Sequence, residues 1–217
     1  MNDAIMKAVY GFRGMGKSSL VKQMMGDYDR IIVLDPMGEF AYLPGFTATA
    51  WQDIPKELAK PKFKISYKPR RGAAAQALHH ICERLLAKQE PYARWMAQGR
   101  PGAAPQEQIL LVIEEMAVSF PSEKLPADLW GMVEMCERGR HSGIEVIGTT
   151  QRPASVSTKF RGLAEETYCF RLTLEHDVNA VCTYIGKQHR ETIINQDKFE
   201  YIHKTISGVE PKKTQKP

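Results

Sequence analysis

Residues 11–18 read GFRGMGKS and directly follow the apolar run 5–10. They match the pattern G-x-x-x-x-G-K-[ST], whose glycines let backbone N–H groups surround a phosphate while the next helix points its N-terminus at the same anion. Lys17 is expected to reach the β- and γ-phosphates, and Ser18 to hold Mg²⁺. The stretch therefore predicts a nucleoside triphosphate site formed by Gly11, Arg13, Gly14, Met15, Gly16, Lys17, Ser18 and Ser19.

Short apolar runs alternate with helical patterns along the rest of the chain. The predicted strands are 5–10, 31–34, 63–67, 109–113, 144–149, 168–172 and 199–203, and the predicted helices are 17–25, 51–60, 73–88, 127–138 and 175–185. This alternation is typical of an α/β fold in which helices flank a mostly parallel central sheet.

Length and composition favour one domain. The chain has 217 residues, 43% of them hydrophobic, which is enough for one sizeable core. We expect a single domain over 1–208, a mobile Pro- and Gly-rich excursion at 89–108 and a basic disordered tail at 209–217.

Composition also limits the compartment and the partners. Apolar runs stay short of the ~18–20 residues that span a bilayer, and the N-terminus has no signal-peptide pattern, so a cytoplasmic protein that does not use a membrane is expected. The scattered Cys82, Cys136, Cys169 and Cys182 predict reduced, mostly buried thiols. The net charge of +5 favours a polyanionic partner.

A second motif follows a buried strand. Residues 108–115 read QILLVIEE, so two carboxylates end a strand at the sheet edge where ligands of open α/β folds bind. Glu114 suits a residue that fixes Mg²⁺ through its water shell, and Glu115 suits a base that polarises the attacking water. The paired acids argue against a GTPase, although acids that merely begin a solvated turn would give the same pattern.

A third motif is the strand and turn at 144–153, which reads IEVIGTTQRP. Gln151 lies at its tip and can donate a hydrogen bond to the γ-phosphate or to the attacking water. Taken alone, a glutamine after a strand is an ordinary turn residue. In sequence order after the two earlier motifs, it predicts a sensor of the phosphate.

The ordered combination of motifs resembles the FtsK/HerA superfamily of DNA-pumping ATPases. It comprises 11–18, LDPMGEF at 34–40, the acidic pair, RGRHSG at 138–143 and TTQRP at 149–153. Within that superfamily the chain is similar to the single-domain packaging ATPases of double-stranded DNA phages and related viruses. One departure is Glu114, because the family usually has aspartate there.

The resemblance implies a RecA-like core of the ASCE class of P-loop NTPases that uses ATP and Mg²⁺. It also implies a homo-oligomeric ring of five or six subunits around double-stranded DNA, docked on a capsid portal or vertex protein, in the host cytoplasm. The resemblance implies a trans-acting arginine in the region of Arg138 and Arg140. We favour Arg140 over Arg138, and Arg152 and Arg161 are the less favoured candidates. The alternative interpretation is that each arginine only solvates a helix end or binds a carbonyl at a helix C-terminus.

Other candidate residues are ambiguous in the sequence. Asp35, grouped with the nucleotide-binding residues, either shapes the pocket or only turns the chain after a strand. The candidate DNA-contacting clusters are Lys68, Arg70 and Arg71; Lys159 and Arg161; Lys212, Lys213 and Lys216; and Arg94, Trp95 and Arg100, the last with a packed lid as the alternative. His79 and His80 are expected to be structural, without a third metal ligand.

Three function classes follow. The first is an ATP-driven translocase of double-stranded DNA, expected in viral genome packaging. The second is an assembly or secretion ATPase resembling the Zot-like proteins of filamentous phages, which normally carry a membrane-spanning segment. The third, a small-molecule P-loop kinase, lacks an arginine-rich lid pattern and leaves the residues at 151–153 without a role.

Overall fold

The apolar runs of the sequence pair into one nine-stranded sheet. A computed structural model describes residues 4–123 and 126–215. The strands are β1 (Met6–Tyr10), β2 (Arg30–Leu34), β3 (Thr47–Ala48), β4 (Phe63–Tyr67), β5 (Ile109–Ile113), β6 (Ile144–Thr150), β7 (Glu166–Phe170), β8 (Glu200–Thr205) and β9 (Gly208–Lys213).

The strand order is β3-β4-β2-β5-β6-β1-β7-β8-β9. All pairings from β3 to β7 are parallel, and β8 and β9 extend the sheet as an antiparallel hairpin. Both sides of β2 and β5 are covered, because every residue of these strands is buried. The predicted fold class, a mostly parallel sheet flanked by helices, is confirmed.

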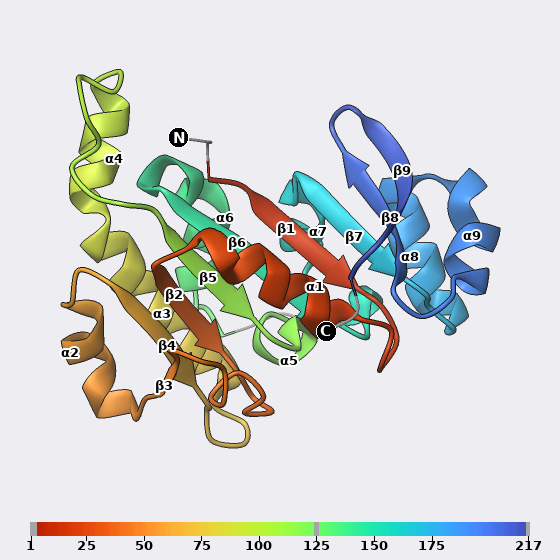
Figure 1. Cartoon of the computed structure of the whole chain (residues 1–217), viewed down its shortest axis with the longest axis horizontal. Helices are drawn as coiled ribbons and strands as arrows, with labels where there is room; N and C mark the ends of the chain where they lie inside the picture. The colour runs from red at the N-terminus through yellow and green to blue at the C-terminus, as the bar shows by residue number, and fades with distance from the viewer. Residues whose placement is uncertain (1–3, 124–125, 216–217) are drawn as a thin grey trace.

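Helices cover the two faces of the sheet unequally (Figure 1). The helices are α1 (Lys17–Met24), α2 (Ile54–Leu58), α3 (Ala74–Lys88), α4 (Glu90–Ala97), α5 (Met116–Ser119), α6 (Gly131–Arg138), α7 (Thr158–Leu163), α8 (Glu175–Ile185) and α9 (Arg190–Asn195). One core cluster joins the sheet to α1 and Phe40, and the other joins it to α3, α5, α6, α7 and α8. The nucleotide-loop helix α1 therefore lies on the opposite face from most of the helical layer.

The excursion predicted at 89–108 is partly wrong. Its first half folds as α4, which begins at Glu90 with Pro91 in the first turn, where the missing N–H of proline costs nothing. Trp95 packs edge-on against the buried Tyr92, with ring centroids 5.1 Å apart, and Arg94 pairs with Glu90. These contacts favour the packed alternative for this cluster over DNA contact.

The disordered tail predicted at 209–217 is also wrong over residues 209–213, which belong to β9. Pro211 is tolerated there because β9 is an edge strand, where one side of the ladder needs no donor. Residues 216–217 lie outside the described residues. All four cysteines are free and buried, as the scattered spacing predicted.

Candidate functional site

The phosphate loop connects the carboxyl end of β1 to α1, and two of its glycines cannot be replaced without strain. Gly11 and Gly16 have φ angles of 155° and 115°. A Cβ on Gly11 would lie 2.5 Å from the Cβ of Phe170, and one on Gly16 would lie 2.7 Å from the Cδ1 of Phe199. The loop conformation therefore requires glycine at both positions.

Lys17 folds back over the same loop. Its Nζ donates to the carbonyl oxygens of Gly11 at 2.8 Å and Phe12 at 3.2 Å. Burial lowers the pKa of Lys17, while the carboxylates of Glu115 and Glu114 oppose that shift. The predicted phosphate-binding cation thus lies in the electrostatic reach of both predicted acids.

Glu114 presents an incompletely bonded carboxyl group. It follows β5, its N–H donates to the carbonyl of Leu34 at 2.9 Å, and its Oε2 accepts the hydroxyl of Thr149 at 2.8 Å. Its Oε1 is buried and has no hydrogen-bond partner among the described residues. Burial raises the pKa of Glu114 to about 7, against the opposing effects of Thr149 and Lys17.

The unpartnered oxygen of Glu114 fits a divalent cation or a water bound to one. Mg²⁺ prefers oxygen ligands and usually retains several of its waters, so one buried carboxylate and a serine hydroxyl such as that of Ser18 form an appropriate donor set. A nearby cation would also favour the ionised carboxylate that burial disfavours. The residues present therefore fit Mg²⁺, and the metal role of Glu114 stays a prediction.

Glu115 and Gln151 are brought into direct contact. Glu115 Oε1 accepts the hydroxyl of Thr150 at 2.7 Å and the N–H of Gln151 at 3.3 Å, and its Oε2 accepts the Gln151 side-chain amide at 3.3 Å. The backbone of Glu115 has φ 49°, a left-handed conformation that non-glycine residues adopt at a cost of ~1–3 kcal/mol. Strain of this kind clusters at functional sites, and here it turns Glu115 toward the tip of β6.

The remaining loop residues have less specific surroundings. Arg13 and Gly14 are exposed, whereas Ser18 and Ser19 are half-buried in the first turn of α1. Met15 accepts the N–H of Phe199 on its carbonyl at 2.9 Å. The nucleotide contacts expected of these residues stay predictions.

Asp35 builds a loop and has no carboxylate oxygen left for a nucleotide. Its Oδ1 accepts the N–H groups of Gly38 and Glu39 at 2.7 and 3.1 Å, and its Oδ2 accepts the Phe40 N–H at 2.8 Å and the Ser66 hydroxyl at 3.0 Å. The side chain is fully buried. Placing Asp35 among the nucleotide-binding residues is therefore corrected: it shapes the loop after β2.

Arg138 and Arg140 lie at the opposite edge of the sheet from the phosphate loop. Both precede β6, whose carboxyl end pairs with that of β1. The seven residues of β6 span about 20 Å at ~3.3 Å per residue. Arg138 pairs with Glu134 at 2.5 Å, and Arg140 is exposed. Within one chain, neither guanidinium is brought to the predicted site.

Arg152 and Arg161, the less favoured candidate arginines, lie nearer the tip of β6. The Nε of Arg152 donates to Asp177 at 2.9 Å, and Asp177 also accepts the N–H of Ala154 at 3.0 Å. Because Asp177 is almost fully buried at the start of α8, it anchors the loop that carries Gln151. Arg161 donates to the carbonyl of Val156 at 3.1 Å.

The sequence did not predict a contact that Phe199 and Thr214 make with α1 and the phosphate loop. Thr214 donates its hydroxyl to Gln23 of α1 at 3.0 Å and its N–H to the carbonyl of Phe199 at 2.9 Å. A Cβ on Gly16 would lie 2.7 Å from the Cδ1 of Phe199 and 3.3 Å from the Cγ2 of Thr214. The C-terminal hairpin thus packs on the phosphate loop, a long-range contact that no local sequence pattern signals.

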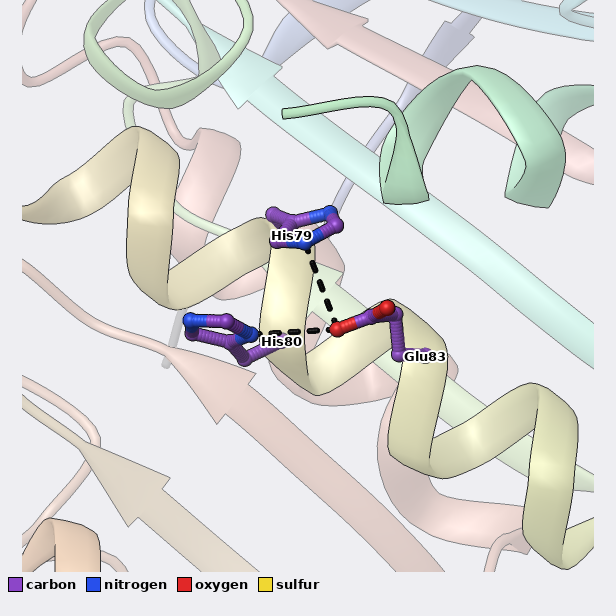
Figure 2. A group of neighbouring side chains, drawn as sticks. All are labelled: His79, His80 and Glu83. Atoms are coloured by element: carbon purple, nitrogen blue, oxygen red, sulfur yellow. Dashed lines mark hydrogen bonds and ion pairs between the residues drawn. The ribbon is translucent and has the colours of Figure 1, made fainter. Parts of the chain in front are cut away.

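His79, His80 and Glu83 lie together on α3 (Figure 2), so the expectation that the histidines lack a third metal ligand is corrected. Glu83 Oε2 lies 3.3 Å from His79 Nε2 and 3.1 Å from His80 Nδ1. The Nδ1 of His79, however, accepts the N–H of Gly131 at 2.9 Å, which puts the proton of the neutral ring on Nε2, facing Glu83. A metal on Nε2 would displace that proton, so hydrogen bonding accounts for the cluster.

Comparison with known proteins bears on this architecture. The sequence model of the family described as zonular occludens toxin (Zot) matches residues 69–208, more than half of the chain. The chain belongs to the Zot family. The matched segment contains the acidic pair and Gln151, whereas the phosphate loop precedes it. No curated protein matches the chain.

Solved structures similar to this Zot-family chain include NTPases and ATPases. The genome packaging NTPase B204 of Sulfolobus turreted icosahedral virus 2, in complex with AMPPCP, has 16% identity and a TM-score of 0.73 over 100% of both chains. The pCW3 conjugation coupling protein TcpA, with ATPgS, has 15% identity and a TM-score of 0.64 over 96% of this chain and 59% of its own. ATPases 2 and 3 of EssC from Geobacillus thermodenitrificans have 12% identity and a TM-score of 0.60 over 94% and 38%.

These likenesses show that the chain shares the fold of these NTPases and ATPases. Across the described residues, none of the helices combines the length and the apolar character needed to cross a bilayer.

Proposed function

We propose that the chain is an ATP-hydrolysing motor that moves double-stranded DNA, and that it serves viral genome packaging. The observation that carries the hydrolysis in this proposal is the contact between Glu115 and Gln151 at the tip of β6, where the N–H of Gly11 in the phosphate loop donates to the carbonyl of Thr150 at 3.2 Å. The likeness to B204, a genome packaging NTPase, supports the packaging role.

Each site residue has a role in the proposed hydrolysis. The loop N–H groups and Lys17 hold the triphosphate, and Glu114 and Ser18 would hold Mg²⁺, which neutralises charge on the β- and γ-phosphates when bound. Water attacks the γ-phosphorus, the bond to the β-phosphate oxygen breaks, and the water proton passes to Glu115. Gln151 orients the attacking water or donates to the γ-phosphate.

A ring of subunits completes the proposed site. Because Arg138 and Arg140 lie about 20 Å from the phosphate loop of their own chain, either one can contribute only to the site of a neighbouring copy. An arginine supplied in trans stabilises the charge of the transition state and makes hydrolysis depend on assembly. The proposed partners are double-stranded DNA, further copies of the chain and a capsid portal or vertex protein.

The test is steady-state ATP hydrolysis with and without long duplex DNA. Glu115→Gln should keep nucleotide affinity and lower turnover by ~10²–10⁴-fold, because it removes the base, whereas Lys17→Ala should lower affinity. Strong stimulation of the wild-type protein by duplex DNA supports the proposal. Equal turnover of Glu115→Gln and wild type contradicts the assigned base.

The second candidate is an assembly or secretion ATPase that does not act on DNA. The specific observation in its favour is the Zot-family match at 69–208. Hydrolysis that depends on Glu115 but is indifferent to DNA would favour this candidate. Transfer of phosphate to an acceptor other than water would instead favour a kinase.

A further inference from the structure

The candidate DNA-contacting clusters differ in how their charges are compensated. Lys159 pairs with Glu137, Lys213 pairs with Glu200 at 2.7 Å, and Lys212 lies 3.4 Å from Glu210. A cation already paired with a carboxylate contributes little net field to a polyanion. Lys216 lies outside the described residues.

The turn after β4 has uncompensated charge. Lys68, Arg70 and Arg71, which we name the basic turn, are all exposed. Lys68 Nζ donates to the carbonyl of Met37 at 3.4 Å, and within residues 4–123 and 126–215 no carboxylate forms an ion pair with any of the three cations. The basic turn therefore presents three positive charges to solvent.

The basic turn lies at the edge of the sheet that carries the nucleotide site. It follows β4, and β4, β2 and β5 are consecutive parallel strands, so their carboxyl ends share one edge (Figure 1). Strands lie ~4.8 Å apart, which places the end of β4 about 10 Å from Glu114 at the end of β5.

Hydrogen bonds connect the end of β4, which precedes the basic turn, to Asp35 after β2. The carbonyl of Tyr67, the last residue of β4, accepts the N–H of Asp35 at 2.9 Å, and Asp35 also binds Ser66 of β4. One residue earlier on β2, the carbonyl of Leu34 accepts the N–H of Glu114 at 2.9 Å. The end of β4 is thus hydrogen-bonded to Asp35, and the residue before Asp35 is hydrogen-bonded to Glu114.

We propose that the basic turn grips the phosphate backbone of duplex DNA; this inference rests on the proposed motor function. Three cations without carboxylate partners match the repeating negative charge of DNA, and binding them releases counterions from the duplex. Phosphate contacts carry no sequence information, so the grip is independent of sequence, as a motor that moves along DNA requires.

The experiment is fluorescence anisotropy of the full chain with a random-sequence duplex over a series of salt concentrations. The slope of log K against log salt is about −0.9 per phosphate contact, so each lost contact makes it less negative by ~0.9. Lys68→Gln/Arg70→Gln/Arg71→Gln should therefore make the slope less negative by ~2–3 and lower the affinity on the order of a hundredfold at ~100 mM salt. Lys159→Gln/Lys212→Gln/Lys213→Gln removes the same charge from paired positions and should keep the slope.

A charge-conserving variant separates electrostatics from folding. Lys68→Arg/Arg70→Lys/Arg71→Lys should bind with the slope of the wild type. Equal slopes for the wild type and the basic-turn glutamine variant, or equal losses in both glutamine variants, would overturn the inference while DNA binding by the wild type leaves the motor function standing. A wild-type protein that binds no duplex would overturn both.

Discussion

Glu114 should make the nucleotide-free protein less stable as the pH rises. Its pKa is raised from 4.5 to about 7 because burial disfavours the charged carboxylate. The protonated form is favoured in the folded state, so the carboxyl group contributes no penalty at low pH and a growing one as the pH passes from 4.5 towards 7. Two-state linkage with these two pKa values gives a loss of about 2.5 kcal/mol between about pH 5 and about pH 8.

Glu114→Gln removes this ionisation while keeping the size of the side chain. Urea unfolding of the wild type and of Glu114→Gln at each pH gives two stability curves, whose difference cancels the other titrating groups. The difference should shift by about 2.5 kcal/mol in favour of the glutamine variant across the range. Glu123→Gln, which alters an exposed carboxylate, controls for the loss of one charge. Parallel curves for the wild type and Glu114→Gln would refute the argument.

Three further predictions concern other parts of the site. Gly16→Ala should lower nucleotide affinity more than tenfold in a fluorescent-nucleotide titration, because its Cβ would lie 2.7 Å from Phe199; Gly162→Ala, with open space around it, should keep the affinity. Mixing Arg140→Ala subunits with Glu115→Gln subunits should restore part of the hydrolysis that each lacks alone, and no recovery at any ratio would argue against Arg140 as a trans-acting residue. Asp177→Ala should lower the free energy of unfolding by ~1–3 kcal/mol, because Arg152 and the N–H of Ala154 lose a buried acceptor; an unchanged urea midpoint would contradict the anchoring role.

Local patterns in the sequence predicted the sheet and the residues that meet at its edge. β5 reads ILLVI, a continuous apolar run, which is the pattern expected of a strand that is buried on both sides. The carboxyl ends of parallel strands share an edge, so the sequence predicts that the phosphate loop, Glu114 and Gln151 lie near one another.

Other features depend on context that local patterns do not carry. Proline breaks a helix when it lies in the interior, but Pro91 lies in the first turn of α4, where proline is tolerated. Proline is likewise excluded from central strands, but Pro211 lies in the edge strand β9. The roles of Asp35 and Phe199 follow from contacts with Ser66 and Gly16, which are distant in sequence. Tertiary packing decides these positions.

Triplex displacement tests the central claim most directly. A labelled third strand bound to linear duplex DNA reports the passage of a motor along that duplex. We predict that the wild-type protein releases the third strand with ATP and that Glu115→Gln does not. Retention of the third strand while duplex DNA stimulates ATP hydrolysis would contradict the claim that this chain moves DNA.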